Sequence, residues 1–187
     1  MSDPRVSPSF PGLPAVLCLS LAVLAAAPAG AARAPIPARP VSAEVYSGRW
    51  YEVARTANKL QKDCQQAFTD FEGFSDGTFA VAESCHRGGP DGPVKTIRAR
   101  AKIISPRDNT RFRMSFFGGL VHQEYWVLDH AEDNSWLIMA TPGGNYVWLM
   151  ARSPVLPKAA LAAATARVAW LGYPPGRLIF GGVDATG

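Results

Sequence analysis

Residues 95–116 read KTIRARAKIISPRDNTRFRMSF, and this stretch decides the fold class. Apolar and polar side chains alternate along 97–103 and again along 111–116, on either side of the turn formers at 106–109. Because successive side chains of a strand point to opposite faces, this period predicts two half-buried β-strands joined by a tight connection. The apolar set should face a core: Ile97, Ala99, Ala101 and Ile103 from the first strand, and Phe112, Met114 and Phe116 from the second.

Six further strand-like runs flank this pair, and turn formers separate them. The eight runs cover residues 50–56, 67–72, 78–84, 95–104, 111–117, 124–129, 136–141 and 146–151. Short connections of this kind favour an antiparallel meander. An open sheet of eight strands would expose two edges, and closing it into a barrel removes them. The sequence therefore predicts an all-β fold, an eight-stranded antiparallel up-and-down β-barrel.

One long helical pattern follows the strands. Pro157 suits a first helical position, and Leu161, Ala164, Val168 and Leu171 recur at helical spacing. Gly172 is a plausible C-terminal stop. The apolar stripe needs a surface to cover, so we expect one C-terminal α-helix packed on the outside of the barrel. Residues 177–180 could return as a short final strand.

Composition indicates one globular domain. The 187 residues include 48% hydrophobic and 18% charged side chains, with a formal net charge of +4. Lys and Arg are scattered along the chain, whereas a nucleic-acid site needs them clustered on one face. We therefore expect no nucleic acid as a partner, while weak attraction to anionic lipid head groups remains possible.

The N-terminal segment has the features of a signal peptide. Residues 13–27 form an apolar run too short to span a bilayer, and Ala29-Gly30-Ala31 offers a cleavage site. We expect residues 1–32 to be removed and residues 33–44 to form a proline-rich linker. An uncleaved membrane anchor is the alternative. A cleaved chain would be periplasmic or secreted.

Three cysteines complete this interpretation. Cys18 lies inside the apolar run without a lipobox, so a lipoprotein anchor is not expected. Cys64 and Cys85 form an even pair, which suggests a disulfide in an oxidising compartment. A hairpin centred on residues 73–76 would place the two cysteines opposite each other. The inward assignment of Phe79 needs a register shifted by one residue, so Cys64 would then lie just outside regular strand geometry.

Three stretches in order resemble the lipocalin family, in particular its bacterial and apolipoprotein-D-like branch. They are Gly48-Arg49-Trp50-Tyr51-Glu52 at the start of the first strand, Gly144-Asn145-Tyr146 before the last, and residues 146–154, which resemble the family's final strand with Arg152 at its end. The resemblance covers residues 45–181, leaving 182–187 as a tail. It implies that Gly48 allows a tight strand entry, that Trp50 plugs the closed end of the barrel, and that Arg152 stacks on Trp50.

Strand alternation then selects candidate ligand-binding residues on the inner face. An interior of this composition suits a lipid-like or flat apolar ligand, or else the same side chains fill a packed core. Glu52 could bind a polar head group or pair near the closed end. The candidates are Glu52, Ala54, Phe79, Val81, Ile97, Ala99, Ala101, Phe112, Met114, Phe116, Tyr146, Trp148 and Met150.

Catalytic motifs are sparse. The sequence has no Gly-x-Ser-x-Gly elbow, no His-Glu-x-x-His and no glycine-rich phosphate loop. Asp129 and His130 resemble part of a metal cluster but are more typical of a capped hairpin. We therefore expect no cofactor, no metal and no enzyme, but a monomer or weak dimer that carries a small hydrophobic ligand such as a fatty acid or lysophospholipid. An isomerase-like enzyme using Cys64, or a structural module with a full core, are the alternatives.

Overall fold

The computed structural model describes residues 33–73 and 76–181. The expected signal peptide and the tail at 182–187 lie outside these residues. Within them the strands are β1 Gly48–Thr56, β2 Cys64–Gly73, β3 Thr78–Arg87, β4 Val94–Ile103, β5 Arg111–Phe116, β6 Val121–His130, β7 Trp136–Ala140, β8 Val147–Ala151 and β9 Leu178–Phe180. The helical elements are η1 Ala43–Tyr46, η2 Phe117–Gly119, α1 Lys158–Trp170 and η3 Pro175–Arg177.

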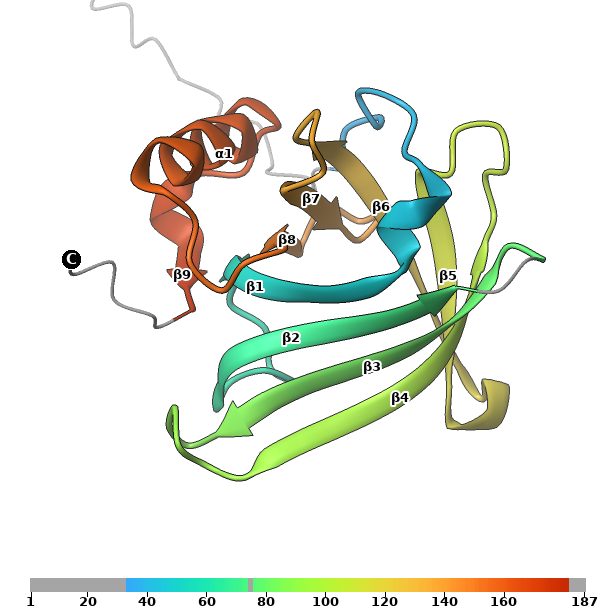
Figure 1. The fold of residues 1–187 in the computed structure, drawn as a ribbon, viewed down its shortest axis with the longest axis horizontal. Coiled ribbons are helices and arrows are strands. Elements are labelled where there is room, and N and C mark those ends of the chain that lie inside the picture. The colour runs from blue at the N-terminus through green and yellow to red at the C-terminus, as the bar shows by residue number, and fades with distance from the viewer. Residues whose placement is uncertain (1–32, 74–75, 182–187) are drawn as a thin grey trace, which may run out of the picture.

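Strands β1 to β8 close into an antiparallel barrel, as the sequence predicted (Figure 1). Each strand pairs with the next, and β1 pairs with both β2 and β8, which leaves no free edge between them. The short β9 adds to the far part of β1, with Ala54 opposite Phe180. The open end carries the connections 57–63, 88–93, 117–120 and 141–146, and the closed end carries the connections 104–110 and 131–135 and the helix η1.

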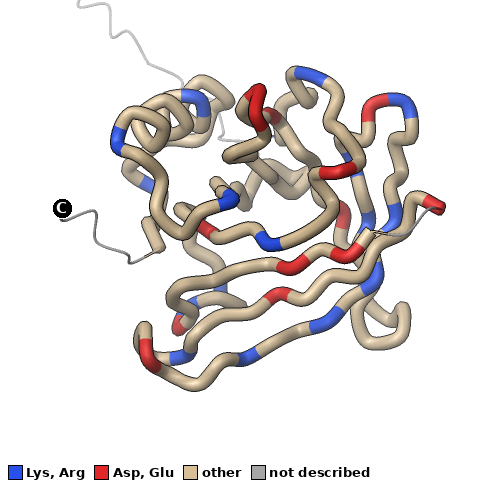
Figure 2. The backbone as a smooth tube through the Cα atoms, viewed as in Figure 1, with Lys and Arg blue, Asp and Glu red and all other residues tan. Residues whose placement is uncertain are grey.

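The alternation along β4 and β5 sorts side chains between the two faces of the wall. Phe112 and Met114 are buried, whereas the intervening Arg113 is exposed. On β4, Arg98, Arg100 and Lys102 are all exposed, and Figure 2 shows basic residues recurring along this strand. Pairing keeps the inner set in register, because Phe112 lies opposite Ile103 and Met114 opposite Ala101.

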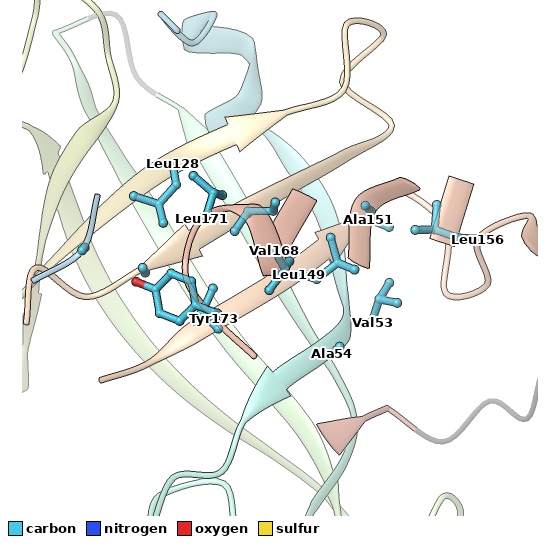
Figure 3. Close-up of a cluster of buried hydrophobic side chains, with 14 residues drawn as sticks. Val53, Ala54, Leu128, Leu149, Ala151, Leu156, Val168, Leu171 and Tyr173 are labelled. Carbon is cyan, nitrogen blue, oxygen red and sulfur yellow. The ribbon is translucent and has the colours of Figure 1, made fainter. Parts of the chain in front are cut away.

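Helix α1 covers one side of the barrel, as expected, and begins at Lys158 with Pro157 as its N-cap. Its buried residues Ala164 and Val168 join a cluster of side chains from the outer face of β1 and β6–β8 (Figure 3). Gly172 ends the helix with a φ of 93°, a left-handed conformation that glycine adopts without steric cost. In the part of the chain that is described, no helix is both long and apolar enough to cross a membrane.

Residues 33–42, which belong to the expected proline-rich linker, pack on the barrel. Their backbone amides donate hydrogen bonds to the barrel, from Ala34 to Pro142 and from Ala38 to Leu128. Arg39 pairs with the buried Asp129 at 2.8 Å, and Arg167 of α1 pairs with the same carboxylate. Proline fixed an extended backbone here, but these long-range contacts cannot be read from composition.

Cys64 and Cys85 form the expected disulfide, with 5.4 Å between their Cα atoms. The hairpin register used for that expectation is wrong. A turn centred on residues 73–76 would give Phe71 a partner closer to the turn, whereas Phe71 lies opposite Val81. A bulge between Gln65 and Phe68 shifts the pairing near the open end. The bulge, with Gln66 at a φ of 45°, brings the two cysteines together.

Candidate functional site

The closed half of the barrel interior is filled with side chains. Tyr46 from η1 stacks on Phe79 with ring centroids 4.8 Å apart, and Phe112 meets both rings edge-on. All three are at most 2% exposed. Edge-on and offset contacts of this kind are the preferred arrangements of aromatic rings. This half therefore has the packing of a core.

Trp50 seals the closed end from inside. Its indole is fully buried and donates a hydrogen bond to the carbonyl of Val45 at 2.9 Å. The guanidinium of Arg152 lies over the ring at 3.8 Å from its centroid and donates to the carbonyl of Ser47. Gly48 has a φ of 69°, and a Cβ there would lie 3.4 Å from the Arg152 guanidinium. The positive φ of the tight strand entry therefore favours glycine at this position, whereas a Cβ would only touch the stacked arginine.

The open half of the interior is different, because its inner-face side chains keep part of their exposure. Ile97 is 37% exposed, and Ala99, Phe116, Tyr125 and Trp148 are of intermediate burial. Tyr125 and Trp148 are neighbours, with ring centroids 5.8 Å apart. Most of the inner-face apolar side chains that keep part of their exposure therefore lie toward the open end.

Beside this wall lies a buried polar group made of Glu52, Arg55 and Gln61. Arg55 forms an ion pair with Glu52 at 3.1 Å, and both side chains are at most 6% exposed. The Gln61 amide donates to Glu52 at 2.7 Å, and its oxygen accepts from the Trp148 indole at 3.1 Å. Burial raises the pKa of Glu52 above its ordinary value, although Arg55 and Gln61 act in the opposite direction. Gln61 thus joins the 57–63 connection to the inside of the barrel.

Glu83 is a second acid on the inner face. It lies opposite Thr69 and Ile97, and its carboxyl forms no hydrogen bond or ion pair with the residues that the structure describes. Burial raises its pKa to about 7, and the neighbouring Glu52 carboxylate adds to that effect. Near neutral pH this carboxyl therefore exchanges a proton inside the open half.

The family model of the lipocalin-like domain matches residues 41–181 of this chain, which is nearly the whole described region. The chain belongs to the lipocalin family. Members of the family typically bind small hydrophobic ligands and are generally binding proteins, not enzymes. An eight-stranded barrel is just wide enough inside to be filled by side chains or to hold one small ligand, and lipocalins are a known example of the second case.

Curated relatives and solved structures agree with this assignment. The lipocalin is 26% identical to the outer membrane lipoprotein Blc of Vibrio cholerae over 72% of this chain and 78% of the relative. It is 26% identical to apolipoprotein D of Rattus norvegicus over 60% of this chain and 61% of the relative. The structure of insecticyanin from the tobacco hornworm Manduca sexta shares the fold, with a TM-score of 0.60 at 16% identity over 80% of this chain and 87% of insecticyanin.

The expected ligand-binding residues of this lipocalin fall into two groups by depth. Those near the closed end belong to the packed core and none is more than 4% exposed: Phe79, Val81, Ala101, Phe112, Met114 and Met150. Those that keep exposure line the open half: Ile97, Ala99, Phe116 and Trp148. Only the second group lies where a ligand could reach it without displacing the core.

One of the expected residues does not face the interior, and another lies outside the strands. Ala54 belongs to the cluster under α1, because a bulge between Glu52 and Ala54 turns the side chains that follow to the opposite face (Figure 3). The same bulge points Arg55 inward, opposite Trp148. Tyr146 precedes β8, is 37% exposed and lies at the open end.

Sequence reasoning missed Arg55, Gln61, Glu83 and Tyr125. The inward direction of Arg55 depends on the bulge in β1, and the position of Gln61 depends on the path of the 57–63 connection. Glu83 could have been found, since it continues the alternation of Phe79 and Val81 along β3. Tyr125 lies on a run that is apolar on both faces, and its pairing with Phe112 decides its side.

Other sites considered from the sequence have a structural explanation. Cys64 is bonded to Cys85, so it has no thiol to act as a nucleophile. Asp129 accepts hydrogen bonds from Arg39 and Arg167, and no cluster of metal-ligating side chains occurs within 33–73 and 76–181. Two grooves on the barrel, of about 380 and 300 Å³, are lined mainly by residues of the outer face such as Arg49 and Arg113.

Proposed function

We propose that this lipocalin binds and carries one small hydrophobic molecule, of the fatty-acid or lysophospholipid kind, in the open half of its barrel. The observation that carries the proposal is the division of the interior. Phe79, Phe112 and Met114 toward the closed end are buried, whereas Ala99, Phe116 and Trp148 toward the open end keep part of their exposure. Pockets for small molecules are mostly apolar, with a few polar groups that fix orientation.

The polar group at the open half would meet the head of such a ligand. Gln61 bridges Glu52 and Trp148, and Arg55 holds the Gln61 carbonyl at 2.8 Å. Nε of Arg55 is buried and has no partner among the described residues. A ligand oxygen that replaces the Gln61 side chain could accept hydrogen bonds from the Trp148 indole and from Arg55. Entry would then displace Gln61 and leave the Glu52–Arg55 pair in place.

We place this function in the cell envelope or outside the cell. A disulfide persists in oxidising compartments, and the pair Cys64–Cys85 fits that setting. The relatives named above are an outer membrane lipoprotein and an apolipoprotein. A cleaved signal peptide remains part of the proposal, as does a monomeric or weakly dimeric state.

A pair of matched substitutions tests the proposal. Ala99→Phe adds a ring to the inner face between Val81 and Phe116, whereas Ala82→Phe adds the same ring to the outer face of the same hairpin. Binding of a long-chain fatty acid and of a lysophospholipid is followed by quenching of tryptophan fluorescence. We expect Ala99→Phe to weaken binding at least about tenfold, since a filled site must expel ligand or strain its wall. Ala82→Phe should bind like the parent, and a lack of saturable binding by the parent would refute the carrier function.

A further inference from the structure

The open end of the barrel exposes large apolar side chains to solvent. Leu60 is 87% exposed, Phe117 is 70% exposed and Leu120 is 86% exposed, and they come from two different connections. Val94, Val121 and Tyr146 add further exposed apolar surface at the same end. The β3–β4 and β5–β6 connections both lie at the bottom of Figure 1. Several large exposed apolar side chains at the rim of an opening are typical of an interaction site.

The closed end has a different surface. Its described connections, at 76–77, 104–110 and 131–135, expose no large apolar side chain. They carry the acids Asp76, Asp108, Glu132 and Asp133, against one base, Arg107. The exposed apolar side chains of the open end therefore have no counterpart in the described connections of the closed end.

Exposed lysines lie beside Leu60 and Val94 at the open end. Lys59 and Lys62 flank Leu60 in the 57–63 connection, and Lys95 follows Val94 at the start of β4; all three are exposed. The same connections hold two acids: Asp63, which is paired with Arg87 at 3.4 Å, and the exposed Asp91. Apolar tips between lysines form the pattern by which proteins bind an anionic bilayer surface, because the tips enter the interface while the ammonium groups meet phosphates.

We propose that the open end of the barrel docks on a membrane surface that carries anionic phospholipids. Leu60, Phe117 and Leu120 enter the head-group region, and Lys59, Lys62 and Lys95 lie against the phosphates. The closed end, with its acidic connections, faces away from the anionic surface. The docking does not depend on what the barrel holds. If the carrier function also holds, the open half would face the bilayer, so a lipid could pass between them without crossing bulk water.

Vesicle binding of the purified full chain tests the docking. The probes are vesicles of phosphatidylcholine alone and of phosphatidylcholine with one third phosphatidylglycerol, at low and at high salt. We expect the parent to prefer the anionic vesicles and to lose that preference at high salt, since screening weakens exposed charges. Phe117→Ser with Leu120→Ser should weaken binding at least about tenfold. Replacing the three lysines by Gln should weaken it about fivefold for each lysine.

The control removes an exposed apolar side chain elsewhere. Trp170 is 70% exposed and lies at the end of α1, outside the four open-end connections. Trp170→Ser should bind vesicles like the parent. All variants keep the same N-terminal segment, so any contribution from residues 13–27 cancels. Parent protein that does not bind anionic vesicles, open-end variants that bind unchanged, or a control that loses as much would each overturn the docking. Ligand binding by the same variants is also measured without vesicles. This measurement tests the carrier function alone, so a failure of the docking proposal can be told apart from a failure of the carrier function.

Discussion

Glu83 gives the sharpest prediction for the interior of the barrel. Its ordinary pKa of 4.5 rises to about 7 in the folded chain, because burial and the Glu52 carboxylate disfavour its charged form. The folded state therefore holds a proton that the unfolded chain releases between those two values. Stability contributed by this proton is complete below pH 4.5 and is lost as pH rises to about 7.

The size of the effect follows from that gap. A shift from 4.5 to about 7 corresponds to about 3 kcal/mol. Since the side chain keeps part of its contact with water, we expect about 2 kcal/mol. Glu83→Gln keeps the shape but cannot ionise, so it should be about 2 kcal/mol more stable than the parent at pH 8 and equal to it at pH 4.5.

Urea unfolding followed by tryptophan fluorescence between pH 4.5 and pH 8 measures this difference. Glu72→Gln is the control, because Glu72 is exposed and lies near the other end of the same hairpin. Its difference from the parent should not change with pH. A difference for Glu83→Gln that is flat, or that grows as pH falls, would show that Glu83 is charged in the fold and would refute the reasoning.

Three further predictions concern the frame of the barrel. Trp50→Ala should lower the free energy of unfolding by about 3–5 kcal/mol. In a double-mutant cycle followed by urea unfolding, Trp50→Ala and Arg152→Ala should be coupled by about 0.5–2 kcal/mol. Additive effects would show that the two side chains do not interact. Replacing both Cys64 and Cys85 by Ser should cost about 3 kcal/mol in urea unfolding, whereas an unchanged midpoint would mean that the bond does not restrict the unfolded chain. Asp129→Asn should lower the free energy of unfolding by about 2–4 kcal/mol, because it leaves Arg39 and Arg167 without their buried carboxylate. A loss no larger than that of an exposed ion pair would contradict the pairing of Asp129 with both arginines.

Much of the barrel could be predicted because short stretches of sequence determine its strands and turns. A period of two along 97–103 and 111–116 sets which side chains of β4 and β5 face inward, and turn formers mark where strands end. Closure of the barrel could be predicted because an open sheet of eight strands would expose two edges. The helix after β8 was readable for the same reason, since its spacing and Gly172 are local signals.

The details of the site could not be read in this way. One bulged residue in β1 reverses every side chain beyond Glu52, and nothing in the local sequence marks it. It sends Ala54 outward and Arg55 inward, and so changes both the wall and the polar group. Gln61 reaches the interior because of the path of the 57–63 connection. Phe79 and Ala99 both face inward as their alternation predicts, but their depth along the barrel makes Phe79 buried and leaves Ala99 partly exposed. These features depend on contacts between residues far apart in sequence.

The most direct test of the central claim is the position of a bound ligand. Intermolecular nuclear Overhauser effects between a lysophospholipid or fatty acid and the assigned protein would locate it. We predict contacts from the acyl chain to Ala99, Phe116 and Trp148, and none to the packed Phe112. Contacts confined to the outer grooves, or no saturable contacts inside the open half, would contradict the claim that this half holds the ligand.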